Sequence, residues 1–427
     1  MARKTLRPVA VIGGVRTPFC RSNSAYSELT NLDMMSTAIQ GLSDKYSLKG
    51  EVIDEVSGGA VITHSKDWNL TREAIQSTDL SPLSPAITMQ QACGTSLQAV
   101  LSSAGKIATG QIECAIAAGS DTTSDAPIVF GRKFAQRLVG LGRARDIKSK
   151  FKLFQGFSPK ELIPQPPSVA EPRTLLSMGQ HCERMAQEWG IDRAAQDELA
   201  VTSHNKASAA YSAGFFDDLL VPCAGIVRDN NLRDDASIEK MATLRTVFDK
   251  TDRATLTAGN STPLTDGASS VLIASEAWAK KHGLPVLAWL TESRTAAVDY
   301  VAGEGLLMAP AVAVSDMLKS AKLGFDDFTH FEIHEAFAAQ VLCTLKAWES
   351  EEYCRQRLQR KDVLGSIDRN KLNINGSSLA VGHPFAATGA RIVATLAKIL
   401  SGTTGGRGLI SVCTAGGMGL SAVLESA

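Results

Sequence analysis

The sequence has no apolar run approaching the ~20 residues that a transmembrane helix requires, and it has no excess charge of either sign. Its 427 residues carry 44 basic and 44 acidic side chains, which argues against general electrostatic attraction to nucleic acid. The start MARKTLRPVAVIGG leads straight into an expected buried strand with no signal-peptide cleavage site, and the final LESA is no retention or peroxisomal address. We therefore expect a soluble, cytoplasmic enzyme-sized protein, or a mitochondrial-matrix one if the source is eukaryotic.

Paired cysteines and grouped metal ligands are also missing. None of the eight cysteines belongs to a C-x-x-C pair, which disfavours a zinc ribbon or a disulfide framework and suggests a reducing compartment. Only His330 and His334 among the seven histidines lie close together, and no further ligands stand nearby. We therefore expect no metal site. Most free cysteines are small buried hydrophobes, and Cys114, inside the apolar ECAIAAG, is expected to be one.

Short apolar runs alternate with helical patterns through the first ~125 residues, which is typical of an α/β fold with parallel strands. A strand–loop–helix–strand unit contains Cys93, and a similar unit near the other end contains His383, so the chain carries a weak internal repeat. Gly110 and Gly402 are expected to end the two helices. Residues 126–258 differ, with a basic stretch, the proline-rich PQPPSVAEP and polar helical patterns. We predict one half from 1–125 plus 259–283, an inserted loop domain at 126–258, and a second half at 284–427.

Four side chains stand where they could carry chemistry. Cys93 lies between a strand end and a helix start, where the helix N-terminus favours a thiolate and could move its pKa toward ~6; a buried structural cysteine fits the sequence equally well. His383, in the tight turn GHPFAATG, could be the accompanying base or a loop histidine used for packing. Cys413 ends a strand beside glycines that let a ligand approach. His334 opens HEAF, which could begin a helix, with Glu335 favourable to the helix dipole.

Five motifs in order, ACGTSLQA, GNSTPLTDGAS, HEAF, GHPFAATG and CTAGGMG, resemble the thiolases within the condensing-enzyme superfamily, and the resemblance covers the whole chain. HEAF in place of N-E-A-F, and C-x-A-G-G in place of C-x-G-G-G, are similar to the β-subunits of trifunctional fatty-acid oxidation complexes. The resemblance implies an α/β fold of duplicated βαβαβαββ halves that form a five-layered α-β-α-β-α core, with an inserted loop domain.

The resemblance also implies an activity, that of a degradative 3-ketoacyl-CoA thiolase (acetyl-CoA C-acyltransferase). Such an enzyme cleaves 3-ketoacyl-CoA with CoA through a Cys93 acyl-enzyme in fatty-acid β-oxidation, with CoA as a substrate and no cofactor. The alternative is a biosynthetic, acetoacetyl-CoA-forming acetyl-CoA C-acetyltransferase. A ketoacyl synthase is disfavoured because those enzymes commonly use paired histidines and no second cysteine. A non-catalytic acyl-CoA-binding protein is disfavoured because every reactive position is present.

Each role is carried over by motif. Cys93 would be the nucleophile, and His383 would take its proton and polarise the thioester oxygen of the substrate. Cys413 would protonate the leaving acetyl-CoA enolate and later act as base on CoA. His383 and His334 would bind the enolate oxygen, and the backbone N–H groups of Cys93 and Ala415 would bind the tetrahedral oxyanion.

Three further residues are candidates for substrate contacts by the same resemblance. Thr262, in GNST, matches a serine that lies against the pantetheine of CoA. Met178 matches a methionine that lines the acyl pocket. Ser177 stands where some short-chain biosynthetic relatives carry histidine, so its smaller side chain would leave room for a longer acyl chain.

Segment 132–160 is strongly basic, with Asp146 as its acidic residue. Four phenylalanines are interleaved with its nine basic side chains, Arg132, Lys133, Arg137, Arg143, Arg145, Lys148, Lys150, Lys152 and Lys160. A solvated basic face is one interpretation. The others are contact with CoA phosphates, with a hydratase/dehydrogenase partner subunit, or with an anionic membrane surface. The family implies a homodimer or tetramer.

Overall fold

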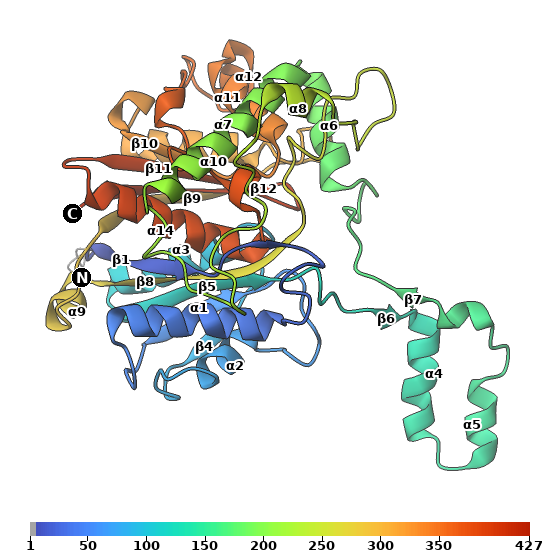
Figure 1. Cartoon of the computed structure of the whole chain (residues 1–427). Coiled ribbons are helices and arrows are strands. Elements are labelled where there is room, and N and C mark those ends of the chain that lie inside the picture. The colour runs from blue at the N-terminus through green and yellow to red at the C-terminus, as the bar shows by residue number, and fades with distance from the viewer. Residues whose placement is uncertain (1–5) are drawn as a thin grey trace.

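The computed structural model describes residues 6–427, and its centre is a mixed β-sheet that runs through both halves of the chain (Figure 1). The strand order is β10-β11-β12-β9-β1-β8-β5-β3-β4. Strands from the first half lie at one end of this order and strands from the second half at the other. The halves join where Val9–Val11 of β1 pairs antiparallel with Ala288–Leu290 of β9.

The first half follows the predicted order of strands and helices. Its elements are β1 (Val9–Arg16), β2 (Cys20–Arg21), α1 (Asn31–Tyr46), β3 (Glu55–Gly59), α2 (Leu70–Gln76), β4 (Ala86–Thr88), α3 (Thr95–Thr109), β5 (Cys114–Asp121), β8 (Thr265–Ser275) and α9 (Glu276–Lys281). β3 pairs parallel with β4 and β5, and β8 pairs antiparallel with β1 and β5. Strands β1, β5 and β8 are buried along their whole lengths, which fits the apolar runs at 9–12, 114–118 and 271–274 within them.

The second half repeats this order, except that a single β-bridge replaces one of the strands. Its elements are β9 (Ala288–Ala297), α10 (Ala309–Ala321), η2 (Phe325–Asp327), β10 (His330–Ile333), α11 (Ala338–Glu349), α12 (Glu351–Gln356), η3 (Arg369–Lys371), α13 (Ser378–Val381), η4 (Phe385–Ala387), α14 (Thr388–Ser401), β11 (Arg407–Thr414) and β12 (Met418–Ser426). β10 pairs parallel with β11, which pairs antiparallel with β12. In place of the third strand, the isolated bridge between Phe331 and Leu372 keeps the parallel direction.

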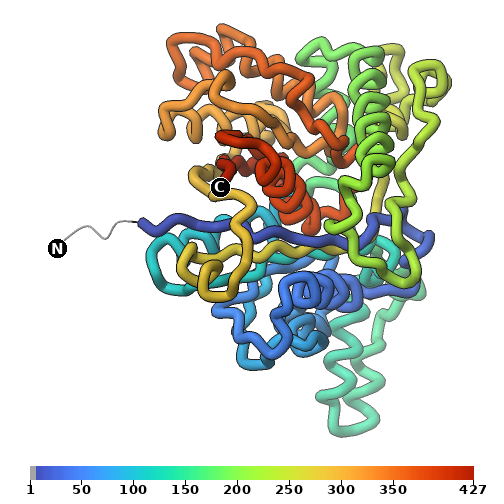
Figure 2. The backbone as a smooth tube through the Cα atoms, turned by 60° about the vertical axis from the view of Figure 1, so that its left-hand side comes forward, coloured from blue at the N-terminus to red at the C-terminus, as the bar shows by residue number. Residues whose placement is uncertain are grey.

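Helices alternate with the two halves of the sheet in five layers (Figures 1 and 2). α1 and α2 cover the outer face of the first half's strands, and α10 covers the second half's. α3 and α14 lie between, since α3 packs on β3 and β5 while α14 packs on β1 and β8 below and on β11 and β12 above. The predicted α-β-α-β-α core is therefore confirmed.

The two central helices approach each other closely at their first turns. Gly389 permits this approach, because a Cβ at that position would lie 2.3 Å from the backbone nitrogen of Leu97. Ser96 Oγ accepts a hydrogen bond from the backbone N–H of Ala390 at 2.9 Å. The start of α3 is thereby fixed against the start of α14. The expected glycines cap both helices, Gly110 in the left-handed conformation (φ 75°) and Gly402 at the end of α14.

Residues between β5 and β8 leave the layered core. Their elements are β6 (Val129–Phe130), α4 (Arg132–Arg143), α5 (Ile147–Leu153), η1 (Pro159–Leu162), β7 (Pro164–Gln165), α6 (Met178–Glu188), α7 (Arg193–Ser212) and α8 (Ile238–Ala242). α6 and α7 pack against α11. β6, α4, α5 and β7 form a hairpin, residues 129–165, that projects away from the body (Figures 1 and 2). The division at 126–258 and 259–283 stays a prediction.

Candidate active site

Cys93 sits where a strand passes into a helix, as the sequence predicts. Ala92, directly before it, has a left-handed backbone (φ 46°), and α3 begins two residues later at Thr95. The Thr95 hydroxyl donates to the Ala92 carbonyl at 2.7 Å and accepts from the Gln91 N–H at 2.9 Å. This local hydrogen-bonded turn holds the strained residue and directs the cysteine toward the second half of the chain.

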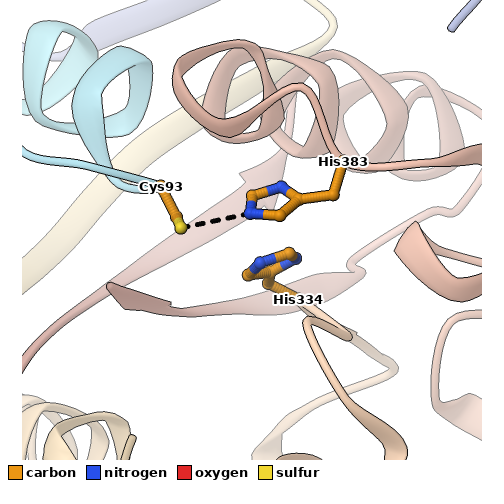
Figure 3. Close-up of side chains that lie close together, drawn as sticks. All are labelled: Cys93, His334 and His383. Carbon is orange, nitrogen blue, oxygen red and sulfur yellow. Dashed lines mark hydrogen bonds between the residues drawn. The ribbon is translucent and has the colours of Figure 1, made fainter. Parts of the chain in front are cut away.

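His383 faces Cys93 from the opposite half of the chain. Its Nε2 lies 3.1 Å from Cys93 Sγ (Figure 3). The backbone N–H of His383 donates to Thr265 Oγ1 at 2.8 Å, and its Nδ1 lies 2.5 Å from Thr388 Oγ1. The turn is therefore tied to β8 on one side and to the first residue of α14 on the other.

His334 completes a group of three. It directly follows β10, and its backbone N–H donates to the Ser411 carbonyl of β11 at 2.8 Å, which keeps it at the end of the parallel pair β10–β11. The His334 and His383 ring centroids are 4.1 Å apart (Figure 3). One ligand atom from each of Cys93, His334 and His383 lies within 4.8 Å of the others. The structure thus brings together three of the four predicted reactive side chains directly.

Burial, rather than the helix N-terminus, governs the ionisation of Cys93. Burial raises the pKa of the Cys93 thiol to about 12, the backbone N–H groups of Ala415 and Cys93 oppose that rise, and the negative charge of Asp121 adds to it. The expectation of a pKa near 6 is therefore wrong. The raised pKa keeps Cys93 a neutral thiol at neutral pH, within hydrogen-bond distance of His383 Nε2.

The two imidazoles are neutral as well. Burial lowers the pKa of His383 to about 3, and the positive charge of Arg391 adds to this effect. Burial also lowers the pKa of His334 well below its usual value, assisted by His383 and Arg391. A neutral imidazole can accept the thiol proton, which a cationic one cannot.

Cys413 lies at the end of β11, two residues before Ala415. It is fully buried, and burial raises the pKa of its thiol well above the usual value, with the negative charge of an ionised Cys93 as the second cause. The thiol therefore keeps its proton at neutral pH, as a proton donor must. The amide of Ala415 is directed at Cys93 Sγ, as is the amide of Cys93 itself, so both predicted backbone donors lie beside the predicted nucleophile.

The HEAF segment is a loop, and Glu335 does not have the helix-stabilising role that the sequence predicts. α11 begins only at Ala338, so Glu335 does not lie in its first turn. Glu335 is buried and accepts hydrogen bonds from Ser203 Oγ at 2.8 Å and from Asn373 Nδ2 at 2.6 Å. It also accepts from the backbone N–H of Leu379 at 3.2 Å. The carboxylate therefore anchors the loop to α7 and α13 instead of stabilising a helix dipole.

The three predicted substrate contacts lie beside this region, each with a structural partner. The Thr262 hydroxyl donates to the Ala336 carbonyl of HEAF at 3.0 Å. Met178 is partly buried against the apolar cluster that includes Cys413. Ser177 Oγ caps α6 by accepting from the Gln180 N–H at 3.2 Å. Their roles toward CoA and the acyl chain stay predictions.

The Cys93, His334 and His383 group also has the donor types of a metal site. Thiolate and imidazole are ligands that Zn²⁺ accepts. Binding an ion would require Cys93 to lose its proton and would occupy the nucleophile. His330, which the sequence paired with His334, does not belong to this group.

Sequence reasoning missed the side chains that hold the two histidines. Ser378 and Thr388 contact His334 and His383, and both hydroxyls belong to the motif SSLAVGHPFAATG. Arg391 lies on the buried side of α14, next to Ile392 and Val393. The sequence offered one signal for these residues: Arg391 is a lone arginine within an apolar helix face, and a buried charge needs polar partners.

Both halves of the chain match a known family. The family described as thiolase, N-terminal domain, matches residues 9–277, and that described as thiolase, C-terminal domain, matches residues 284–426. The chain belongs to the thiolase family. A 3-ketoacyl-CoA thiolase of Shewanella baltica is 38% identical over 98% of this chain and 96% of its own length.

Two solved structures of thiolases share the fold. The acetyl-CoA acetyltransferase of Bacillus anthracis has a TM-score of 0.83 and 27% identity over 99% of this chain and 100% of its own. Human mitochondrial 3-ketoacyl-CoA thiolase in complex with CoA has a TM-score of 0.81 and 27% identity over 99% of both chains. The family resemblance stated from the motifs is confirmed.

The buried thiol generates a pH prediction. Because the pKa of Cys93 is raised to about 12, its thiolate fraction should be negligible between about pH 6 and pH 9 and should grow only above that range. The measurement is the thiolate ultraviolet absorption of the wild type minus that of Cys93→Ser. Cys114→Ser is the control, since Cys114 is a buried thiol outside the site whose pKa is also raised to about 12. A step in the Cys93 difference near pH 6 would contradict the prediction.

Proposed function

We propose that this thiolase is a degradative 3-ketoacyl-CoA thiolase that transfers an acyl group from 3-ketoacyl-CoA to CoA in fatty-acid β-oxidation. The contact of 3.1 Å between Cys93 Sγ and His383 Nε2 carries the proposal. It pairs a nucleophile with a base inside a buried site of a chain whose relatives include 3-ketoacyl-CoA thiolases. The degradative assignment rests on Ser177, a smaller side chain than the histidine that some short-chain biosynthetic relatives carry at this position.

The first half-reaction breaks a carbon–carbon bond. Cys93 Sγ attacks the C3 carbonyl carbon of the substrate while His383 Nε2 takes the thiol proton. The tetrahedral oxygen lies against the amides of Cys93 and Ala415. When the C2–C3 bond breaks, its electron pair moves onto the acetyl-CoA thioester as an enolate, whose oxygen His383 and His334 bind. Cys413 gives its proton to C2, and acetyl-CoA leaves.

The second half-reaction restores both cysteines. The Cys413 thiolate takes the proton of the incoming CoA thiol, and the CoA sulfur attacks the acyl carbon on Cys93. The new thioester forms as the bond to Cys93 Sγ breaks, and the proton held by His383 returns to that sulfur. The balance needs no oxidant, metal or prosthetic group, so we propose CoA as a substrate and no cofactor.

Steady-state thiolysis of 3-ketoacyl-CoA substrates from about four to sixteen carbons tests this function. We expect kcat/KM to stay level or rise with chain length, and to be unchanged by a chelator. Cys93→Ser should show no turnover. A sharp preference for acetoacetyl-CoA would instead indicate the acetyl-CoA C-acetyltransferase activity named for the Bacillus anthracis protein, and absence of thiolysis throughout would refute both.

We also propose assembly into a homodimer or tetramer. β4 is the last strand of the sheet order, and Ile87 on this edge strand is 46% exposed. An edge strand can pair with another copy through its free backbone groups. Sedimentation equilibrium distinguishes the two assemblies.

A cytoplasmic location stays a prediction. Within residues 6–427, no helix has the length and apolar character to cross a membrane.

The hairpin at 129–165 is the strongest candidate for a surface that binds another molecule or a membrane. Helices α4 and α5 bury no residue, and Ile147 and Phe151, on one face of α5, are 74% and 76% exposed. Lys148, Lys150 and Lys152 interleave with them. Exposed apolar side chains among lysines fit an anionic lipid surface, which we propose in preference to CoA phosphates or a hydratase/dehydrogenase subunit.

Vesicle co-sedimentation tests this contact. The wild type should bind vesicles containing anionic phospholipid and not zwitterionic ones, with binding weakened by salt. Ile147→Ser with Phe151→Ser should abolish binding and leave thiolysis within twofold. Lys280→Glu with Lys281→Glu, on the exposed end of α9, is the matched charge control and should bind normally. Failure of the wild type to bind anionic vesicles would overturn the proposal and favour a protein partner.

A further inference from the structure

A buried serine and a buried arginine lie on the Nδ1 side of the His334 ring. Ser378 Oγ lies 2.8 Å from His334 Nδ1, and Arg391 Nη2 donates to the same oxygen at 2.7 Å. All three residues are buried. We propose that Ser378 and Arg391 are positioning residues that hold His334 in the tautomer with its proton on Nε2. The inference rests on the proposed function only for its effect on rate.

The direction of these hydrogen bonds follows from what each group can donate. A guanidinium has five N–H donors and no acceptor, so the oxygen of Ser378 must accept from Arg391. Burial lowers the pKa of Arg391 to about 10, with Glu332 opposing the change, so the guanidinium stays charged at neutral pH. The polarity of this bond is therefore fixed.

The hydroxyl hydrogen of Ser378 then has a single available acceptor among the described residues. His334 Nδ1 and Arg391 Nη2 are the partners of Ser378 Oγ within residues 6–427. If the oxygen accepted from both, its own hydrogen would be a buried donor without an acceptor, which is unfavourable. Ser378 therefore donates to Nδ1, and the single proton of the neutral His334 ring lies on Nε2.

The other nitrogen of His334 is left available for substrate. Nε2 is buried and has no hydrogen-bond partner among the described residues. With its proton fixed there, Nε2 is a donor aimed at the group of Cys93 and His383, as an enolate oxygen requires. The opposite tautomer would present a lone pair to that oxygen and repel it.

The proposed function requires the opposite tautomer of His383 in the same site. To act as the base of the proposed function, its Nε2 must accept from the Cys93 thiol, 3.1 Å away, so its single proton must lie on Nδ1, 2.5 Å from Thr388 Oγ1. Two rings with centroids 4.1 Å apart would then carry their protons on different nitrogens, although each Nδ1 faces a hydroxyl. One ring is poised as a base and the other as a donor.

Nitrogen-15 NMR of the histidine-labelled enzyme reads the tautomers directly, because protonated and unprotonated ring nitrogens resonate apart. His334→Gln and His383→Gln assign the two rings by loss of signal. We expect the Nε2–H form for His334 and the Nδ1–H form for His383 in the wild type. An Nδ1–H form of His334 in a wild type that performs thiolysis would overturn the inference and leave the proposed function intact. If the expected tautomers are found in an enzyme that performs no thiolysis, the proposed function is overturned and the inference about Ser378 and Arg391 stands.

Variants separate positioning from simple packing. Ser378→Ala should give His334 a mixed tautomer and lower kcat by about tenfold or more, toward the ~10²–10³ that a lost oxyanion donor costs, with KM for CoA unchanged. Ser378→Thr, which keeps the hydroxyl, should restore both.

Ser377→Ala is the matched control. The neighbouring Ser377 is also buried and accepts from Arg391 Nη1 at 3.2 Å, but its hydroxyl does not contact His334. The change should leave the His334 tautomer intact and kcat within twofold. A pure Nε2–H form and full kcat in Ser378→Ala would overturn the inference. If Ser378→Ala does not fold, the wild-type tautomers decide.

Discussion

The hydrogen bond between Cys93 Sγ and His383 Nε2 joins two residues 290 positions apart in the sequence, and it lies at the junction of the two halves of the chain. Each residue precedes one of the two central helices. Those helices meet at Gly389, where a side chain would strike the backbone of Leu97. The pairing of the proposed nucleophile with the proposed base therefore depends on a helix–helix contact with no room for even one methyl group.

Burial of this pair determines how the proposed reaction must begin. A pKa of about 12 makes ionisation of Cys93 by itself about 4 kcal/mol more costly than for an ordinary thiol. A ready-made thiolate is thus replaced by a neutral pair, in which charge separates only as the substrate oxygen begins to take up negative charge. In the proposed reaction the amides of Cys93 and Ala415 would bind that oxygen, and His334 would bind the enolate oxygen that forms later. The same exclusion of water protects a thioester from hydrolysis.

The order of elements and the family could be predicted because both are encoded locally. Apolar periodicity marks α3 and α14, glycines mark their ends, and the five motifs surround the reactive side chains. The ionisation of Cys93 could not be predicted, since the helix N-terminus is visible in the sequence whereas the depth of burial arises from the other half of the chain. Glu335 was misplaced for a similar reason: its partners Ser203 and Asn373 are distant in sequence.

Trapping the covalent intermediate tests the central claim most directly. The enzyme would be mixed with a medium-chain 3-ketoacyl-CoA in the absence of CoA, quenched with acid and digested, and the acyl group located by peptide mass spectrometry. The account predicts one acyl group per chain on Cys93, formed together with acetyl-CoA and removed on addition of CoA. Acetyl-CoA formation with no acyl group on the protein, or with the acyl group on another residue such as Cys413, would contradict it.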